Sequence, residues 1–259
     1  MTDDAAFFER DGEDYVASAH GRGPWSVDHL HGGPPTALMA RVARDQLGAD
    51  VAVARVTVEL LRPVPIGRLR VVAAPLTTGA TAPRVGVTLL SGEQELARAV
   101  VMGLREVDAP DAERGGLGER LEPPEAARAF DFAFFRWEVG YHTAMEARLL
   151  EGEVGRGPVK MWMRPRVALV AGEETGAVER VLVCADSGSG VSQILDPRRF
   201  TFVNADLTVY FERAPVGAWT CLDARTTIGP RGVGLAESRL WDERGLFGRG
   251  AQGLVVRGR

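Results

Sequence analysis

Cysteine, lysine and long apolar runs are all scarce in this chain of 259 residues. Only Cys184 and Cys221 carry thiols, which excludes a small scaffold held by several disulfides and is typical of a reducing compartment. No apolar run approaches the roughly 18 residues that a membrane-spanning helix requires. The first residues, MTDDAAFFERDG, lack the basic leader and apolar stretch of a signal peptide. We therefore expect a cytoplasmic protein with no membrane insertion.

Positive charge comes almost entirely from arginine, because Lys160 is the single lysine. The formal net charge of −4 argues against a nucleic-acid partner, and 45% hydrophobic with 25% charged residues is ordinary globular composition. Most of the arginines are expected to be solvated. A few could hold phosphate groups at the mouth of a binding site, and the candidates are Arg164, Arg166, Arg198 and Arg199.

The common catalytic signatures are missing. The chain has no G-x-S-x-G elbow, no Walker loop and no complete G-x-G-x-x-G motif. His29 and His31 lie two residues apart, but no third ligand cluster accompanies them, so no metal site is expected. The spacing favours no pairing of a cysteine with a histidine either. No cofactor is predicted.

A repeat is present instead. The segment FVNADLTVYFERAPVG at 202–217 resembles VARVTVELLRPVPIG at 53–67. Three identical residues recur at an offset of 151 (208 − 57): Thr57, Val58 and Arg62 in the first copy, and Thr208, Val209 and Arg213 in the second. The repeat indicates a duplicated architecture.

Each half is predicted to be one helix followed by a run of antiparallel strands. In the first half a short strand at 15–20 precedes a helix whose apolar positions run through 36–47 and which Gly48 ends. Turn chemistry then separates four strands at 52–61, 68–77, 84–90 and 95–104. In the second half a helix within 175–195 breaks near a Gly-Ser cluster, and strands are expected at 143–150, 159–165, 202–211, 219–227, 234–242 and 246–256.

Domain boundaries follow from composition. Residues 107–128 are rich in proline, glycine and charge, as a linker is. The first unit is therefore 1–106 and the second is 129–259. The fold class is α+β, with a helix covering the apolar face of each sheet and the two sheets continuing edge to edge.

Three polar residues of the second half lie among apolar neighbours: Asp186 in the helix, Asn204 in the following strand and Gln252 in the last strand. A buried carboxylate needs partners, which two amides can supply, and an Asp so held can accept a proton from water. At the same offset the first half has Val53, and Val100 or Val101. This asymmetry suggests one catalytic half and one scaffold half. The alternative is structural: helix and strand capping, with a surface glutamine.

Four segments together carry a resemblance: HGGPPTALMARVAR, DLTVYFERAP, CADSGSG and GRGAQGLVVR. In this order they resemble the double hotdog acyl-CoA thioesterases, meaning the type II bacterial enzyme and its actinobacterial relatives. The resemblance implies two tandem hotdog units, an acyl-CoA substrate, a place in lipid metabolism and no cofactor. In that family a helix Asp, a strand Thr and a last-strand Gln orient the hydrolytic water. The matching residues are Asp186, Asn204 and Gln252, with Asn in place of Thr.

The resemblance also implies an acyl tunnel between helix and sheet, with the thioester carbonyl near a helix N-terminus. Backbone N–H groups of Gly32, Gly33, Gly188 or Gly190 are candidates to stabilise the oxyanion, although plain turn geometry explains the same glycines. His31 either touches the substrate or is bonded to the backbone at a strand end. The wall itself is not predicted, since most of the aromatic and methionine residues at 134–137 and 161–163 are expected to belong to the core. Open sheet edges and an exposed helix face lead us to expect a homodimer.

Two other functions remain open. A hotdog hydratase or dehydratase acting on acyl-CoA uses an Asp and His pair, and the second half offers only His142, far from the strand that would carry the pair. A non-catalytic acyl-CoA-binding module would share the same tunnel. Release of free thiol from acyl-CoA separates an enzyme from such a module.

Overall fold

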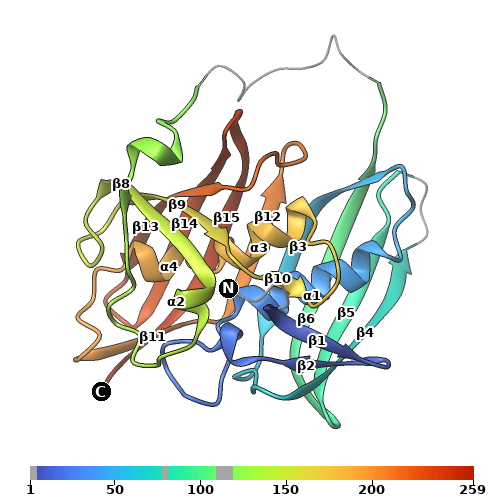
Figure 1. Cartoon of the computed structure of the whole chain (residues 1–259), viewed down its shortest axis with the longest axis horizontal. Helices are drawn as coiled ribbons and strands as arrows, with labels where there is room; N and C mark the ends of the chain where they lie inside the picture. The colour runs from blue at the N-terminus through green and yellow to red at the C-terminus, as the bar shows by residue number, and fades with distance from the viewer. Residues whose placement is uncertain (1–4, 78–80, 109–118) are drawn as a thin grey trace.

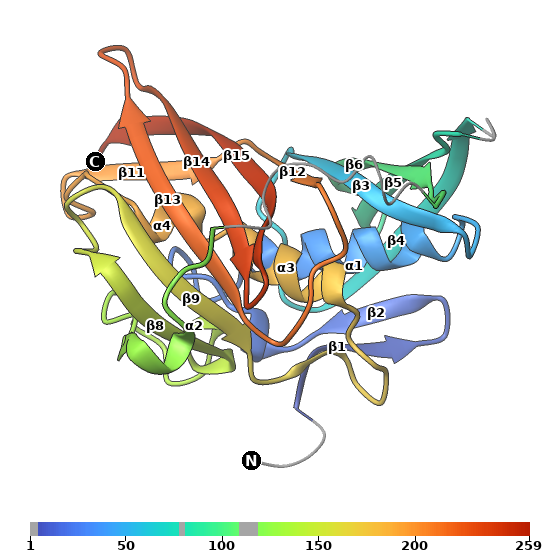
Figure 2. The same cartoon turned by 90° about the horizontal axis from the view of Figure 1, so that it is seen from above.

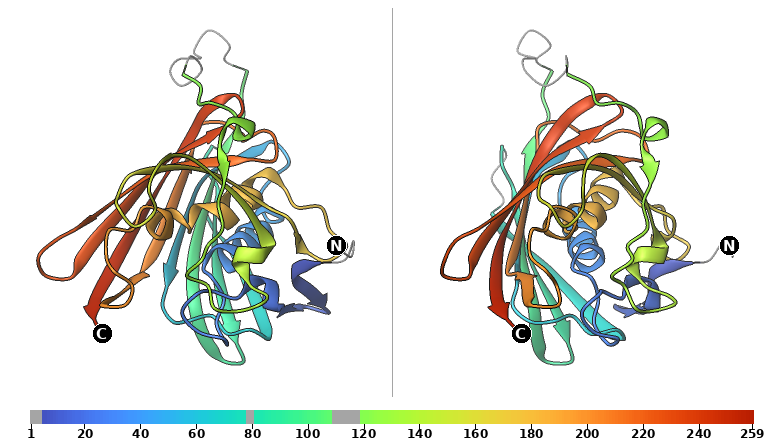
Figure 3. Two further views of the ribbon diagram at one scale, coloured as in Figure 1. Left: turned by 60° about the vertical axis from the view of Figure 1, so that its left-hand side comes forward. Right: turned by 90° about the vertical axis from the view of Figure 1, so that its left-hand side faces the viewer.

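The computed structural model describes residues 5–77, 81–108 and 119–259. Its strands form one continuous, strongly curved sheet, in the order β10-β1-β2-β4-β5-β6-β3-β12-β15-β14-β13-β9-β8-β7, with β11 paired to β15 (Figure 1). The sheet bends around two helices that lie side by side on its concave face (Figures 2 and 3). The layered architecture expected from the repeat is therefore confirmed.

The first half contains β1 (Ala6–Asp11), β2 (Asp14–Ala17), the 3₁₀ turn η1 (Ala19–Gly21), α1 (Gly33–Arg44), β3 (Val51–Leu60), β4 (Arg68–Thr77), β5 (Arg84–Ser91) and β6 (Gln94–Arg105). The second half contains η3 (Pro124–Ala126), β7 (Arg128–Ala129), α2 (Tyr141–Ala144), β8 (Met145–Gly152), β9 (Val159–Pro165), β10 (Ala168–Val170), α3 (Ala177–Ala185), α4 (Gly188–Val191), β11 (Phe200–Asn204), β12 (Asp206–Phe211), β13 (Thr220–Ile228), β14 (Val233–Asp242) and β15 (Gly245–Gly258).

The two halves join through β3 and β12, which pair antiparallel with Thr57 opposite Thr208. They are also interlocked, because β1 of the first half pairs in parallel with β10 of the second. The buried faces of α1 and α3 belong to one apolar core that draws on both halves. The halves are thus two copies in sequence but share one core in space.

Four expected boundaries are corrected. The helix α1 ends at Arg44, before Gly48, because Asp45 caps it and a turn follows. The strand predicted at 15–20 ends at Ala17, where Ser18 caps the turn η1, and β1 precedes it. Residues 143 and 144 belong to α2, with the strand starting at Met145. The strand predicted at 202–211 is divided at Ala205.

The division at Ala205 has a clear cause. The side chain of Asp206 accepts a hydrogen bond from the backbone N–H of Gly253 at 2.7 Å, and so takes the place of a backbone carbonyl in the ladder. The strand before the break, β11, pairs with β15, while β12 pairs with both β15 and β3. This irregularity sets Asn204 at the end of its strand, next to the helices.

The predicted linker lies partly outside the described residues, since 109–118 are not among them. Its later part is packed rather than free. Pro124 of η3 and Ala127 are buried, and the indole N–H of Trp162 donates to the carbonyl of Glu122 at 3.0 Å. No helix in the described part of the chain is long and apolar enough to cross a membrane.

Candidate active site

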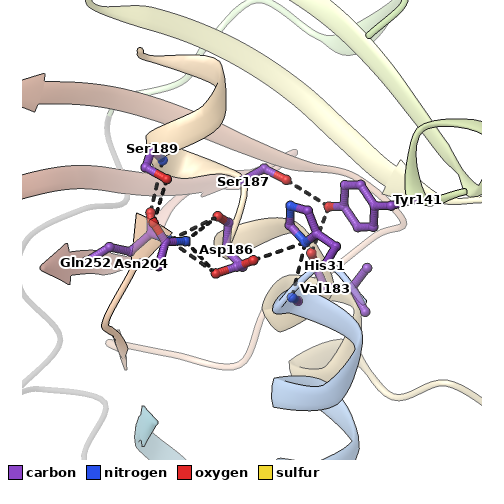
Figure 4. A network of polar contacts seen from close by, with 9 residues as sticks. His31, Tyr141, Val183, Asp186, Ser187, Ser189, Asn204 and Gln252 are labelled. Carbon is purple, nitrogen blue, oxygen red and sulfur yellow. Dashed lines mark hydrogen bonds and ion pairs between the residues drawn. The ribbon is translucent and has the colours of Figure 1, made fainter. Parts of the chain in front are cut away.

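Asp186 lies at the break between two helices. The helix α3 ends at Ala185, Asp186 caps it, and α4 begins two residues later. The side chain is 5% exposed, and one of its oxygens, Oδ1, accepts a hydrogen bond from Asn204 Nδ2 at 2.8 Å. Gln252 Nε2 donates to the main-chain carbonyl of Asp186 at 2.9 Å and approaches Oδ1 at 3.3 Å (Figure 4). The structure therefore brings the three predicted polar residues together.

Ser189 completes this network, although no pattern in the sequence predicts a role for it. Its hydroxyl donates to Asn204 Oδ1 at 2.7 Å, and its backbone N–H donates to Gln252 Oε1 at 3.0 Å. Each amide is held at both its oxygen and its nitrogen, which fixes which end faces Asp186. The only sequence signal for Ser189 is its place in the Gly-Ser cluster that breaks the helix.

The second oxygen of Asp186 faces the first half of the chain. His31 Nδ1 lies 3.0 Å from Asp186 Oδ2, and the imidazole stacks on Tyr141 with ring centroids 3.8 Å apart and planes at 3° (Figure 4). The hydroxyl of Tyr141 donates to the carbonyl of Val183 and shares a hydrogen bond with Ser187, each at 2.8 Å. Burial lowers the pKa of His31, while the charge of Asp186 acts in the opposite direction. Burial raises the pKa of Tyr141, which therefore stays neutral.

Gly32 and Gly33 allow the N-terminus of α1 to meet the C-terminal end of α3. A Cβ at Gly33 would lie 2.3 Å from the carbonyl oxygen of Val183, and one at Gly32 would lie 2.8 Å from Asp186 Oδ2. Pro34 and Pro35 follow and have no N–H, so the backbone donors at this helix start come from the two glycines, and the N–H of Gly33 points at His31 Nδ1 from 3.2 Å. The positive end of α1 therefore points at the Asp186 carboxylate.

A cavity of about 390 Å³ opens beside these groups. Both halves line it: residues 23–26, 29–32 and 60–64 come from the first, and the second contributes residues in 132–141 and 186–204. Among the predicted site residues His31, Gly32, Asp186 and Asn204 lie on its wall, as does Gly190. Gly33, Gly188 and Gln252 lie behind the wall. A Cβ at Gly188 would contact Ser238 and Gln252, which shows that this glycine serves packing.

The rest of the wall is mostly apolar and aromatic. Phe134 and Phe135 line it, and Trp25 meets Phe202 edge to face with centroids 5.4 Å apart. Trp137 is not on the wall and donates its N–H to the carbonyl of Gly23, while residues 161–163 are buried in the core. None of the four candidate arginines lines the cavity, whereas the exposed Arg62 does.

Within the residues that the structure describes, no three histidine, cysteine, aspartate or glutamate side chains gather as metal ligands. Cys184 and Cys221 are both buried and unpaired with each other. Burial raises the pKa of each thiol, so neither is poised as a thiolate nucleophile. The chemistry of the cavity thus rests on the carboxylate, the imidazole and the amides.

Two family models match the chain. Residues 21–103 match the model described as the acyl-CoA thioesterase N-terminal domain, and residues 119–256 match the acyl-CoA thioesterase C-terminal domain. Together the two matches cover most of the chain. No curated protein sequence matches it.

Solved structures share the fold over nearly the whole length. A protein with a hot dog fold from Alicyclobacillus acidocaldarius is 17% identical with a TM-score of 0.77, covering 99% of this chain and 98% of that one. A protein described as a candidate thioesterase from Novosphingobium aromaticivorans is 20% identical with a TM-score of 0.76, covering 97% and 99%. An acyl-CoA thioesterase II from Mycobacterium marinum is 13% identical with a TM-score of 0.69, covering 97% and 96%. The fold is a double hotdog.

Proposed function

Because the chain belongs to the acyl-CoA thioesterase family, and is therefore a thioester hydrolase acting on acyl-CoA, we propose that water activated at Asp186 carries out its reaction. The observation that supports this proposal is the environment of the carboxylate. Asp186 lines the cavity, yet one oxygen and the main-chain carbonyl are held by Asn204 and Gln252. A buried carboxylate fixed in this way is ready to polarise a water in the cavity.

In this proposal the substrate lies in the cavity in one orientation. The acyl group occupies the apolar part lined by Phe134 and Phe135, and the thioester carbonyl lies near the start of α1. There the N–H of Gly32, which lies on the cavity wall, stabilises the oxyanion, helped by the helix dipole. Arg62 is exposed at the cavity and is the candidate partner for the CoA phosphates.

Asn204 replaces the threonine that the resemblance leads us to expect. Its Nδ2 donates to Asp186 while its Oδ1 accepts from Ser189, so it supplies the hydrogen bond that a hydroxyl would supply. Gln252 is 2% exposed and lies behind the wall, so it acts on Asp186 and does not touch substrate. In this proposal Asp186 supplies the charge, and the amides fix its geometry.

The direct test is thiol release from a panel of acyl-CoAs of different chain length and ring content. We expect the wild-type chain to release thiol from some of them, and Asp186→Asn to lose at least about a hundredfold in kcat, since that is the contribution of a positioned acid or base. Asn204→Thr is the matched variant that restores the familiar hydroxyl and is expected to retain activity. Wild-type protein that binds acyl-CoA but releases no thiol would instead be a non-catalytic binding module.

One observation favours a second candidate. The Asp and His pair of a hotdog hydratase, which the second half could not supply, is formed across the halves by Asp186 and His31 at 3.0 Å. The same preparation should therefore be tested for hydration of a 2-enoyl-CoA, which is measured as loss of the enoyl absorbance. Hydration without thiol release would replace hydrolysis by this function.

The homodimer and the cytoplasmic location are part of the same proposal. Val72 and Leu76 of β4 and Tyr210 of β12 are about half exposed, and a second copy would cover apolar surface of this kind. Light scattering of the purified chain tests the dimer. Cell fractionation tests the location.

A further inference from the structure

We propose that His31 of the first half is the general base of the reaction, held by Asp186 of the second half as the two members of one catalytic pair. This inference rests on the proposed function and deepens it, because it names the atom that takes the proton from water. It also changes the role of the first half, which contributes a catalytic group as well as a scaffold.

A proton lies between the side chains of His31 and Asp186. His31 Nδ1 lies 3.0 Å from Asp186 Oδ2, and a carboxylate oxygen approaches a ring nitrogen so closely only when a proton lies between them. The N–H of Gly33 also points at Nδ1, from 3.2 Å. One nitrogen cannot both donate to Asp186 and accept from Gly33. A charge-assisted bond to a carboxylate is the stronger of the two, so Nδ1 carries the proton.

That tautomer decides which ring nitrogen is basic. If Nδ1 carries the proton of the neutral ring, Nε2 has the free lone pair and is the basic atom. The N–H of Gly33 is then also free of the imidazole and remains a donor at the start of α1. The proton on Nδ1 therefore makes Nε2 the base.

Nε2 is accessible from the cavity. His31 lies on the cavity wall with 14% of its side chain exposed. No hydrogen bond from any described residue reaches Nε2, and the atom is not fully buried. It therefore remains accessible from the cavity, and in Figure 4 it is the ring nitrogen of His31 that no dashed line reaches.

The imidazole of His31 and the carboxylate of Asp186 are both held in place by further contacts. Tyr141 covers one face of the imidazole at 3.8 Å, and its own hydroxyl is fixed by Val183 and Ser187. Asp186 is fixed in turn by Asn204 and Gln252. A histidine that served only packing would need neither an oriented carboxylate nor a free nitrogen facing the cavity. This arrangement is the one expected of an oriented base.

The chemical step then balances. As the water oxygen bonds to the thioester carbon, Nε2 takes one water proton, and the Asp186 carboxylate stabilises the imidazolium. The tetrahedral intermediate collapses by breaking the bond from carbon to sulfur, and Nε2–H returns its proton to the leaving sulfur. The products are a carboxylic acid and CoA thiol, and the imidazole is neutral again.

The charged and titratable groups around the ring are few in the described residues. Asp186 faces its edge from the end of α3, and Tyr141 faces it from α2 as a neutral phenol, since burial raises its pKa. The Cys184 thiol of α3 is also neutral, because burial raises its pKa, and His29 shares the cavity wall. Burial lowers the pKa of His31, which leaves the base unprotonated at neutral pH.

The test is His31→Asn. The asparagine Nδ2 is as many bonds from Cα as the histidine Nδ1, so it keeps a donor for Asp186 while the basic Nε2 is lost. We expect kcat to fall by at least about a hundredfold, with KM little changed. In the wild-type chain kcat/KM falls as pH drops through the pKa of His31, and this pKa lies below its ordinary value of about 6.5. In the variant this acid limb of the pH profile disappears.

The matched control is His142→Asn. Burial also lowers the pKa of His142, but this histidine does not line the cavity, so its variant should keep both the rate and the acid limb. An acid limb that vanishes in His142→Asn, or a His31→Asn chain with wild-type rate and pH profile, overturns the inference. Circular dichroism shows whether each variant is folded, and if His31→Asn is not, the wild-type profile compared with that of His142→Asn decides.

Failure of this inference differs from failure of the proposed function. Wild-type chain that releases no thiol from any acyl-CoA overturns both. Wild-type chain that is active, loses activity in Asp186→Asn and keeps it in His31→Asn overturns the inference alone, and makes Asp186 itself the base.

Discussion

Thr57 of β3 and Thr208 of β12 lie opposite each other where the two halves join, with their hydroxyl oxygens 3.4 Å apart and 151 positions between them in the chain. This pair marks the centre of the internal symmetry. Thr57 pairs with Val100 on its other side and Thr208 pairs with Ala251, so Val101 and Gln252 hold equivalent places. In the same way Val53 pairs with Gly103, and Asn204 with Leu254. The duplication has therefore kept the backbone and changed the polar groups.

Gln252→Leu makes the second half resemble the first at this place. The variant leaves the main-chain carbonyl of Asp186 and the N–H of Ser189 without their buried partner. We expect it to lower the free energy of unfolding by about 1–3 kcal/mol, the cost of leaving a buried polar group unpaired, and to reduce kcat. Urea denaturation followed by fluorescence measures the first effect, and thiol release measures the second. Unchanged stability would show that Gln252 is not held as described.

Ser189→Ala removes the donor that fixes the oxygen end of Asn204. Without it the amide can turn over and present its oxygen to the Asp186 carboxylate, which is repulsive. We expect kcat to fall roughly tenfold while KM changes little, because a lost hydrogen bond of about 1.4 kcal/mol is a factor of ten. Ser189→Thr keeps the hydroxyl and should restore most of the rate. If Ser189→Ala were as active as Ser189→Thr, this role of the hydroxyl would be contradicted.

Gly33→Ala tests the close approach of α1 to α3. Its Cβ would lie 2.3 Å from the carbonyl oxygen of Val183, so the two helices must separate, and we expect a loss of about 1–3 kcal/mol in the free energy of unfolding. Gly190→Ala is the matched control for stability, because a Cβ there meets nothing within 4 Å. Thermal melting of the two variants should therefore differ clearly. Equal melting temperatures would show that the helix ends are not packed so tightly.

The pair of Arg213 and Asp242 predicts how stability depends on pH. The Asp242 side chain is fully buried and receives both terminal nitrogens of Arg213 at 2.6 Å, and the N–H groups of Val216 and Arg244 at 2.8 Å. Burial alone would raise the pKa of Asp242, but these hydrogen bonds together hold it below its ordinary value. The stabilisation is therefore present above the unfolded pKa of about 3.9 and is lost as pH falls through the lower folded value.

Asp242→Asn should cost about 3 kcal/mol near neutral pH, because it leaves a partly buried guanidinium without its counter-charge. Its free energy of unfolding should also fall less steeply than that of the wild type below about pH 4. Urea denaturation at a series of pH values measures both effects. Glu153→Gln, in an exposed ion pair with Arg156, is the control and should change little. Parallel pH curves for wild type and Asp242→Asn would contradict the assignment.

Local patterns were sufficient for most strands. β4 and β9 have the predicted bounds, β5 differs by one residue at one end, and β3 and β6 differ by one residue at each end, because turn residues mark strand ends within the chain itself. The short elements were missed for the opposite reason. β1 and β10 pair with each other across the halves, and β7 has two residues, so neighbouring sequence carries little information about them.

The sequence by itself determined the duplication, the two helix and strand units and the asymmetry of Asp186, Asn204 and Gln252, because repeats and apolar periods are properties of the chain. Only the tertiary structure decided that His31 meets Asp186, that Ser189 ties the two amides together, and that both halves line the cavity. The physical reason is that these contacts arise where the end of one helix packs on the start of another, and no local pattern encodes which distant side chains will face each other there.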